Sequence, residues 1–183
     1  SGAYLGLIIV GFFYLLSRKG TEQFRKIVIA GFFLAVALSM SLPIIAKEYS
    51  SRQFGGEEIN NRLILAERAG ELFAESPLLG VGLNNFIVRL PEAGNSAQIN
   101  WWLQPVHNIV LLLLAETGIL GLLAFLYVIY KALYLCLVKK RTALVLVLVF
   151  ILITGVFDHY WLTLQQNQLL LSLALGLSLR RNL

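Results

Sequence analysis

Long stretches of the sequence carry almost no charged side chains, and these stretches constrain the fold more than any other feature. A transmembrane helix needs roughly 20 mostly apolar residues, fewer if neighbouring segments help. Five candidate spans meet this condition: Ser1–Ser17, Ile27–Ala46, Val106–Tyr130, Thr142–Phe157 and Tyr160–Leu179. The pattern predicts an all-α integral membrane protein with about five transmembrane helices.

The charged residues support a membrane protein rather than a nucleic-acid-binding one. Charged residues make up only 14% of the chain, whereas an ordinary soluble domain has about a quarter. The net charge of +5 could suggest nucleic acid, but ten of the fifteen lysines and arginines lie beside the apolar stretches, at 18–26, 131, 139–141 and 180–181. Basic residues in short loops next to spans mark the cytoplasmic side. We therefore expect a lipid bilayer and no nucleic acid as partner.

Alternation of the five spans places the 18–26 link, the 139–141 link and the C-terminus in the cytoplasm. A loop over residues 47–105 and a corner over residues 158–160 then lie outside. These outer parts contain five basic and eight acidic residues, the reverse of the inner side. A loop of this length is too long to be a simple connector, so we expect it to contribute to function.

The best-organised part of the outer loop is Glu57–Glu75, where the spacing predicts an amphipathic helix that ends before Pro77. Its glutamates 67, 71 and 75 share one face, and the other face carries Ile59, Ala66, Ala69 and Phe73. Arg62 falls in the middle of the apolar face. It could be an arginine whose stem packs while its head reaches lipid phosphate or water, or a cation that binds an anion in a protein pocket.

The residues after this helix allow a tight turn. Gly80 and Gly82 lie two apart in the sequence Pro77-Leu78-Leu79-Gly80-Val81-Gly82, but two such glycines alone are weak evidence for phosphate binding. We interpret the segment as a turn between two loop helices.

His107 follows Pro105, and a proline near a helix start is favourable. The spacing predicts His107 in the first turn of the third span, at the outer membrane surface. A helix N-terminus disfavours the imidazolium, so a histidine there could accept a proton from a hydroxyl. The alternative is an interfacial histidine that bonds to a neighbouring loop.

Two further polar sites have structural interpretations. Glu116 falls near the middle of the third predicted span, where a carboxyl group usually has a partner or faces a cavity; we favour a hydrogen bond to a neighbouring helix over a role in proton transfer. The Asp158-His159-Tyr160-Trp161 corner is typical of an aromatic belt with a capping aspartate.

The chain offers few residues for metals or cofactors. Asp158 is its single aspartate and Cys136 its single cysteine, which excludes both a paired Asp-x-Asp metal site and an internal disulfide. With only two histidines, we predict a chain without a metal or cofactor.

Several of these segments together resemble the O-antigen ligase/polymerase family of bacterial membrane proteins. The resemblance rests on Arg62, on the segment from Ser76 to Phe86, and on His107-Asn108 followed after nine residues by Gly118-Ile119-Leu120-Gly121. The fixed spacing of the last element makes it the most specific part. The opening Ser1-Gly2-Ala3 is similar to residues inside the family's longer chains, so we expect a single membrane domain, 1–183, that is the C-terminal part of a longer polytopic protein.

This resemblance implies metal-independent glycosyl transfer on the outer face of the bacterial cytoplasmic membrane. The donor would be an undecaprenyl-diphosphate-linked glycan, and the acceptor a lipid-anchored saccharide. By position, Arg62 would bind the donor diphosphate, with Arg89 as a further candidate, and His107 would be the catalytic histidine. The family often has tryptophan where this chain has Ala66. A polymerase of the same family and a solute transporter that couples through Glu116 remain the alternatives.

Overall fold

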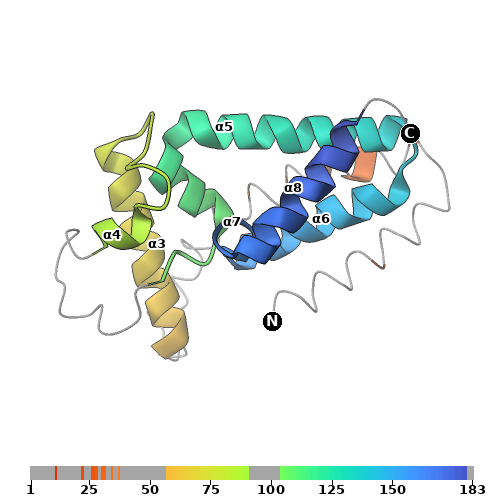
Figure 1. Cartoon of the computed structure of the whole chain (residues 1–183). Helices are drawn as coiled ribbons and strands as arrows, with labels where there is room; N and C mark the ends of the chain where they lie inside the picture. The colour runs from red at the N-terminus through yellow and green to blue at the C-terminus, as the bar shows by residue number, and fades with distance from the viewer. Residues whose placement is uncertain are drawn as a thin grey trace. The chain divides into compact units, whose positions relative to one another are not determined.

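The computed structural model describes residues 57–90 and 104–180, together with Gly11, Glu22, residues 26–28 and 30–31, Leu34 and Ala37. Within these residues the chain forms helices and no strand. They are α3 (Glu57–Glu75), α4 (Phe86–Arg89), α5 (Ile109–Val138), α6 (Thr142–Phe157), α7 (Tyr160–Thr163) and α8 (Gln165–Leu179). Figure 1 shows these helices in order of colour along the chain.

The chain divides into two compact units, and the boundary falls inside α5, between Ala124 and Phe125. One unit contains α3, α4 and the start of α5. The other contains the rest of α5 with α6, α7 and α8 (Figure 1).

The unit that contains α6, α7 and α8 has an apolar core built mainly from α5, α6 and α8, with Val28 as a further member. Ile129 and Cys136 of α5, Leu148 and Ile151 of α6 and Ala174 of α8 all lie in it. At one end of this unit, basic side chains cap α8. Lys139 Nζ donates to the Arg180 carbonyl at 3.0 Å, and Arg141 Nη1 donates to the Leu177 carbonyl at 2.9 Å. The 139–141 link and the end of α8 therefore lie together, as expected of segments on one side of a membrane.

The predicted helix over 57–75 is confirmed, since α3 has the same bounds. Its buried face differs from the predicted one, because Leu65, Ala69 and Leu72 form the centre of the buried stripe. Arg62 lies three and seven residues before Leu65 and Ala69, on the same side of α3, and its side chain is exposed. Ile59 lies outside the residues whose side chains are described.

Of the predicted spans, Thr142–Phe157 coincides with α6. The span predicted over 106–130 begins later and continues to Val138, and α5 is the one helix in the described part of the chain that is long and apolar enough to cross a membrane. The span predicted over 160–179 is interrupted at Leu164, whose extended backbone separates α7 from α8. The spans predicted over 1–17 and 27–46 lie almost entirely outside the described residues.

Helix α5 is longer than predicted because it continues past Lys131 and ends at a residue type that seldom ends a helix. Lys131 is exposed, with its Nζ 5.8 Å from the centre of the Tyr127 ring, and the helix passes it without a break. It ends where Lys140 takes a left-handed conformation (φ 55). The Arg141 N–H then bonds to the Cys136 carbonyl, and the Lys140 N–H to the Leu137 carbonyl. This is the Schellman ending that glycine usually provides.

Candidate functional site

The turn after α3 and the start of α5 are joined through their backbones. The Val81 N–H donates to the Ala115 carbonyl and the Gly82 N–H to the Glu116 carbonyl, both at 2.9 Å. In the opposite direction, Ile119 N–H donates to the Pro77 carbonyl at 2.9 Å. These bonds use carbonyls and amides that the helix leaves unpaired where it is broken at Gly118, whose φ of 65 and ψ of −168 are not helical. We call this set of contacts the loop–α5 junction.

Two glycines make this close approach possible. A Cβ at Gly80 would lie closer than 3.0 Å to backbone atoms of Glu116 and Thr117, and one at Gly118 equally close to the backbone of Leu78 and Leu79. Both residues also have positive φ, which glycine adopts at little cost. The predicted turn at Gly80-Val81-Gly82 is therefore confirmed, and its Gly80 fits against the backbone of α5.

The second glycine of the His-Asn-x9-Gly-x-x-Gly element has a packing role as well. A Cβ at Gly121 would collide with the Thr117 side chain, and the Thr117 hydroxyl donates to the Leu113 carbonyl at 2.8 Å. The spacing Gly-x-x-Gly thus allows both the break in α5 and the packing of the turn that precedes it.

Asn108 fixes the beginning of α5. Its Oδ1 accepts the N–H groups of Val110 at 2.9 Å and Leu111 at 3.1 Å, which makes it an N-cap. Helix α5 therefore begins at Ile109, and His107 lies one residue before the cap. The prediction that placed His107 in the first helical turn is wrong by this margin. His107 is half-buried at the entry to the helix.

Glu116 is buried and belongs to the loop–α5 junction. Its Oε1 accepts the backbone N–H of Phe86 at 3.2 Å, the first residue of α4. The expected hydrogen bond to a neighbouring helix is confirmed. Glu116 thereby holds the start of α4 on the last turn of α5 before the break.

The three basic residues of the described loop differ in their contacts. Arg89, at the end of α4, forms an ion pair with Glu75 at the end of α3, with 2.8 Å between Nη2 and Oε2. Arg68 forms an ion pair with Glu71 one turn along α3. Arg62 is exposed on α3.

The two arginines proposed for the donor belong to different helices, Arg62 to α3 and Arg89 to α4. Arg62 precedes Glu75, the partner of Arg89, by 13 residues, which is about 20 Å at 1.5 Å per helical residue. One diphosphate is much smaller than this separation. Arg62 therefore lies in the first half of α3, whereas Arg89 is paired with the last residue of that helix.

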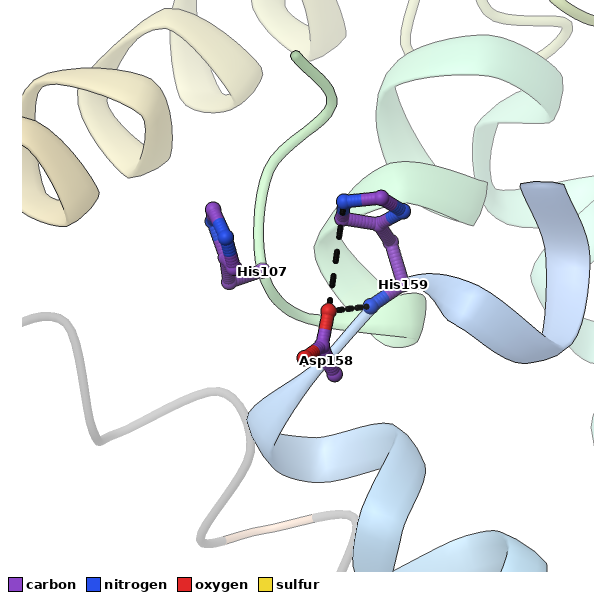
Figure 2. Close-up of side chains that lie close together, drawn as sticks. All are labelled: His107, Asp158 and His159. Atoms are coloured by element: carbon purple, nitrogen blue, oxygen red, sulfur yellow. Dashed lines mark hydrogen bonds and ion pairs between the residues drawn. The ribbon is translucent and has the colours of Figure 1, made fainter. Parts of the chain in front are cut away.

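The corner after α6 contains a histidine with a fixed orientation (Figure 2). The Asp158 Oδ1 accepts the His159 backbone N–H at 2.9 Å and lies 3.9 Å from His159 Nε2. On the other side of the ring, His159 Nδ1 is 2.7 Å from the Thr163 hydroxyl, which itself donates to the His159 carbonyl. The tautomer of the ring decides which of the two atoms, Nδ1 or the hydroxyl oxygen, donates in this hydrogen bond. His159 is buried. His107, which Figure 2 also draws, belongs to the other unit.

Comparison with known proteins decides the family. Residues 1–126 match the family described as O-antigen ligase, and this range covers more than half of the chain. The chain belongs to the O-antigen ligase family.

One curated relative of this O-antigen ligase family member is a protein of Rickettsia conorii whose printed name is "Putative polysaccharide ligase". The two are 28% identical over 142 residues, which cover 70% of this chain and 33% of the relative. The chain thus spans about a third of the length of the relative it matches. No solved structure matches it.

The O-antigen ligase match includes Arg62, Arg89, His107 and the loop–α5 junction, and it ends within α5. The Asp158–His159 corner lies beyond it. Sequence reasoning treated that corner as an aromatic belt and missed the bond to Thr163. The available signal was the four-residue spacing of His159 and Thr163, which places them on one face of a helical turn. Trp161 is likewise a packed residue, because its Nε1 donates to Thr154 Oγ1 on α6 at 2.7 Å.

Proposed function

We propose that this chain is the part of an O-antigen ligase that transfers a glycan from undecaprenyl diphosphate to a lipid-anchored saccharide. The reaction takes place on the outer face of the bacterial cytoplasmic membrane and uses no metal. The observation that carries the proposal is the family match over the segments that form the loop–α5 junction. Both the family description and the relative's name say ligase, which favours a ligase over a polymerase or a transporter.

In the proposed reaction, an acceptor hydroxyl oxygen forms a bond to the anomeric carbon of the donor sugar. The bond from that carbon to the phosphate oxygen breaks, and undecaprenyl diphosphate leaves. His107 accepts the hydroxyl proton. Arg62 holds the negative charge of the leaving diphosphate, for which the planar guanidinium is well suited. Asn108 and the α5 N-terminus keep His107 at a fixed place on the scaffold.

The proposed topology has five spans, with the 47–105 loop outside and the C-terminus in the cytoplasm. It is supported by the apolar helix α5 and by the basic residues 139–141 at its end. The contact between this link and the end of α8 also agrees with a common side for both.

The proposal is tested by complementation of a strain that lacks the full-length protein. The variants are His107→Ala and Arg62→Ala, with Gln104→Ala and Asn61→Ala as controls at neighbouring positions. Glycan attached to its acceptor is scored on a gel, and protein in the membrane fraction by immunoblot. We expect both test variants to lose attached glycan at normal protein level, while free lipid-linked glycan accumulates and the controls keep attachment.

Near-normal attachment in both test variants would overturn the proposed chemistry. Loss of chain length with attachment retained would instead identify a polymerase. Arg89→Ala is scored separately, because Arg89 belongs to α4 and is paired with Glu75.

A further inference from the structure

The turn between α3 and α4 exposes an unusual number of large apolar side chains. Leu78 is 63% exposed, Leu79 and Leu83 are each 70% exposed, and Val88 of α4 is 64% exposed. We call these four residues the apolar tip. Exposed apolar side chains that occur singly are ordinary, but several on one short segment indicate contact with another apolar phase or surface.

The apolar tip continues the exposed surface of α5. Leu120 N–H donates to the Leu78 carbonyl at 3.3 Å, so these two leucines are direct neighbours. Leu120 and Leu123 are themselves each 54% exposed on α5. From the break at Gly118 to Val138, α5 has 20 residues, a length of about 30 Å that matches the hydrocarbon core of a bilayer. The tip thus adjoins α5 directly after its break at Gly118.

The charges around the tip fit a position within a bilayer. Residues 76–88 contain no charged side chain. The two residues that flank them, Glu75 and Arg89, form an ion pair with each other. The segment is therefore a neutral loop closed at its base by a paired acid and base, as expected where a chain enters and leaves the headgroup region.

Part of the backbone of this loop meets the main requirement for lipid exposure, which is that polar groups are bonded within the protein. Gly80 N–H donates to the Ser76 carbonyl, and the bonds of the loop–α5 junction use the N–H groups of Val81 and Gly82 and the carbonyls of Pro77 and Leu78. Pro77 has no N–H to satisfy. Asn85 Nδ2 bonds to the Val81 carbonyl.

We propose that the apolar tip inserts into the acyl chains of the outer leaflet, so that the turn between α3 and α4 is a re-entrant membrane element beside α5. The bound partner is phospholipid hydrocarbon. This assignment does not depend on the glycosyl transfer proposed above, and it gives the outer loop an anchor in the membrane surface.

The test measures the surroundings of single cysteines in the whole chain, reconstituted in vesicles of phosphatidylethanolamine and phosphatidylglycerol. The native thiol is removed by Cys136→Ala. Leu79→Cys and Leu83→Cys are then labelled with the fluorophore NBD and quenched either by nitroxide-bearing lipids or by aqueous iodide. Leu123→Cys on α5 is the lipid reference. Gly70→Cys, at an exposed position of α3 with open space around it, is the water reference.

We expect both tip labels to be quenched by lipid nitroxide as strongly as the Leu123 label, and iodide quenching to fall at least fivefold below that at Gly70. Iodide quenching equal to that at Gly70 would show that the tip lies in water. Protection from both quenchers would show that another protein surface covers it. Either result overturns the proposal, and the use of two tip positions guards against a local effect of one substitution.

Discussion

Replacement of Gly118 by alanine tests whether the loop–α5 junction holds together the unit that contains α3, α4 and the start of α5. Gly118 has φ 65 and ψ −168, a region that only glycine occupies readily, and other residues pay about 1–3 kcal/mol there. The new Cβ would lie closer than 3.0 Å to the backbone of Leu78 and Leu79. Relief requires the turn to move, which breaks the bonds from Ile119 to Pro77 and from Leu120 to Leu78. Each is worth about 0.5–1.5 kcal/mol.

These contributions give a destabilisation of about 2–6 kcal/mol. For a chain of 183 residues, 1 kcal/mol corresponds to roughly 2–4 °C in Tm, so a central value of about 4 kcal/mol lowers Tm by about 8–16 °C. The measurement is thermal melting by circular dichroism in detergent. The matched control is Gly70→Ala, since a Cβ there meets nothing within 4 Å. Alanine in a helix is favoured over glycine by about 0.5–1 kcal/mol, so the control is expected to melt slightly higher.

A second comparison separates the junction from a general loss of stability. Gly80→Ala disturbs the same contact from the other side, so the double variant is expected to cost clearly less than the sum of the two single ones. A Gly118→Ala protein that melts within 2–3 °C of the wild type would refute the reasoning, and strict additivity would show that the two glycines do not share one contact.

Three further predictions follow from single contacts. Asn108→Ala removes the N-cap of α5 and is expected to lower stability by about 1 kcal/mol, whereas Asn108→Asp keeps an acceptor oxygen and melts close to the wild type; equal melting of both variants would contradict the capping role. Glu116→Gln keeps an acceptor for the Phe86 N–H and is expected to retain glycan attachment in complementation, while Glu116→Ala leaves that N–H unsatisfied at about 1–3 kcal/mol and lowers attachment; a Gln variant as defective as the Ala variant would point to proton transfer. Lys140→Gly relieves the left-handed conformation at the end of α5 and is expected to stabilise the chain by about 1 kcal/mol, measured as a higher Tm, with no change or a decrease as the opposing result.

Helices with clear local boundaries could be predicted from the sequence. Helix α3 ends just before a Ser-Pro pair, and α6 lies between Arg141 and Asp158, so both have the predicted bounds. In α5 the predicted end at Tyr130 rested on the charge of Lys131. A lysine on an exposed helix face can direct its ammonium away from the apolar surface, and the helix continues to a Schellman ending without glycine. No glycine or proline lies at Leu164, so the sequence pattern did not indicate the break there.

The candidate site was predictable in its residues but not in its contacts. The glycine signature was recognised as a pattern, yet the reason for Gly80 and Gly118 is a segment 36 to 40 residues away in the chain: Gly80 meets Glu116, and Gly118 meets Leu78. Periodicity and local propensity carry no information about such pairs. The same applies to Arg89, whose ion pair with Glu75 depends on how the turn brings α4 back to α3.

The distance between the cap and the break in α5 has a consequence for variation in this region. Nine residues, Ile109–Thr117, separate the Asn108 cap from Gly118, which is 2.5 turns of helix at 3.6 residues per turn. The length of this short segment sets the direction in which His107 faces relative to the turn that is bonded to α5 at the break. Removal or insertion of one residue would rotate His107 by about 100° around the helix axis while leaving every chemical group present. A change in the number of residues in this segment would therefore redirect the histidine.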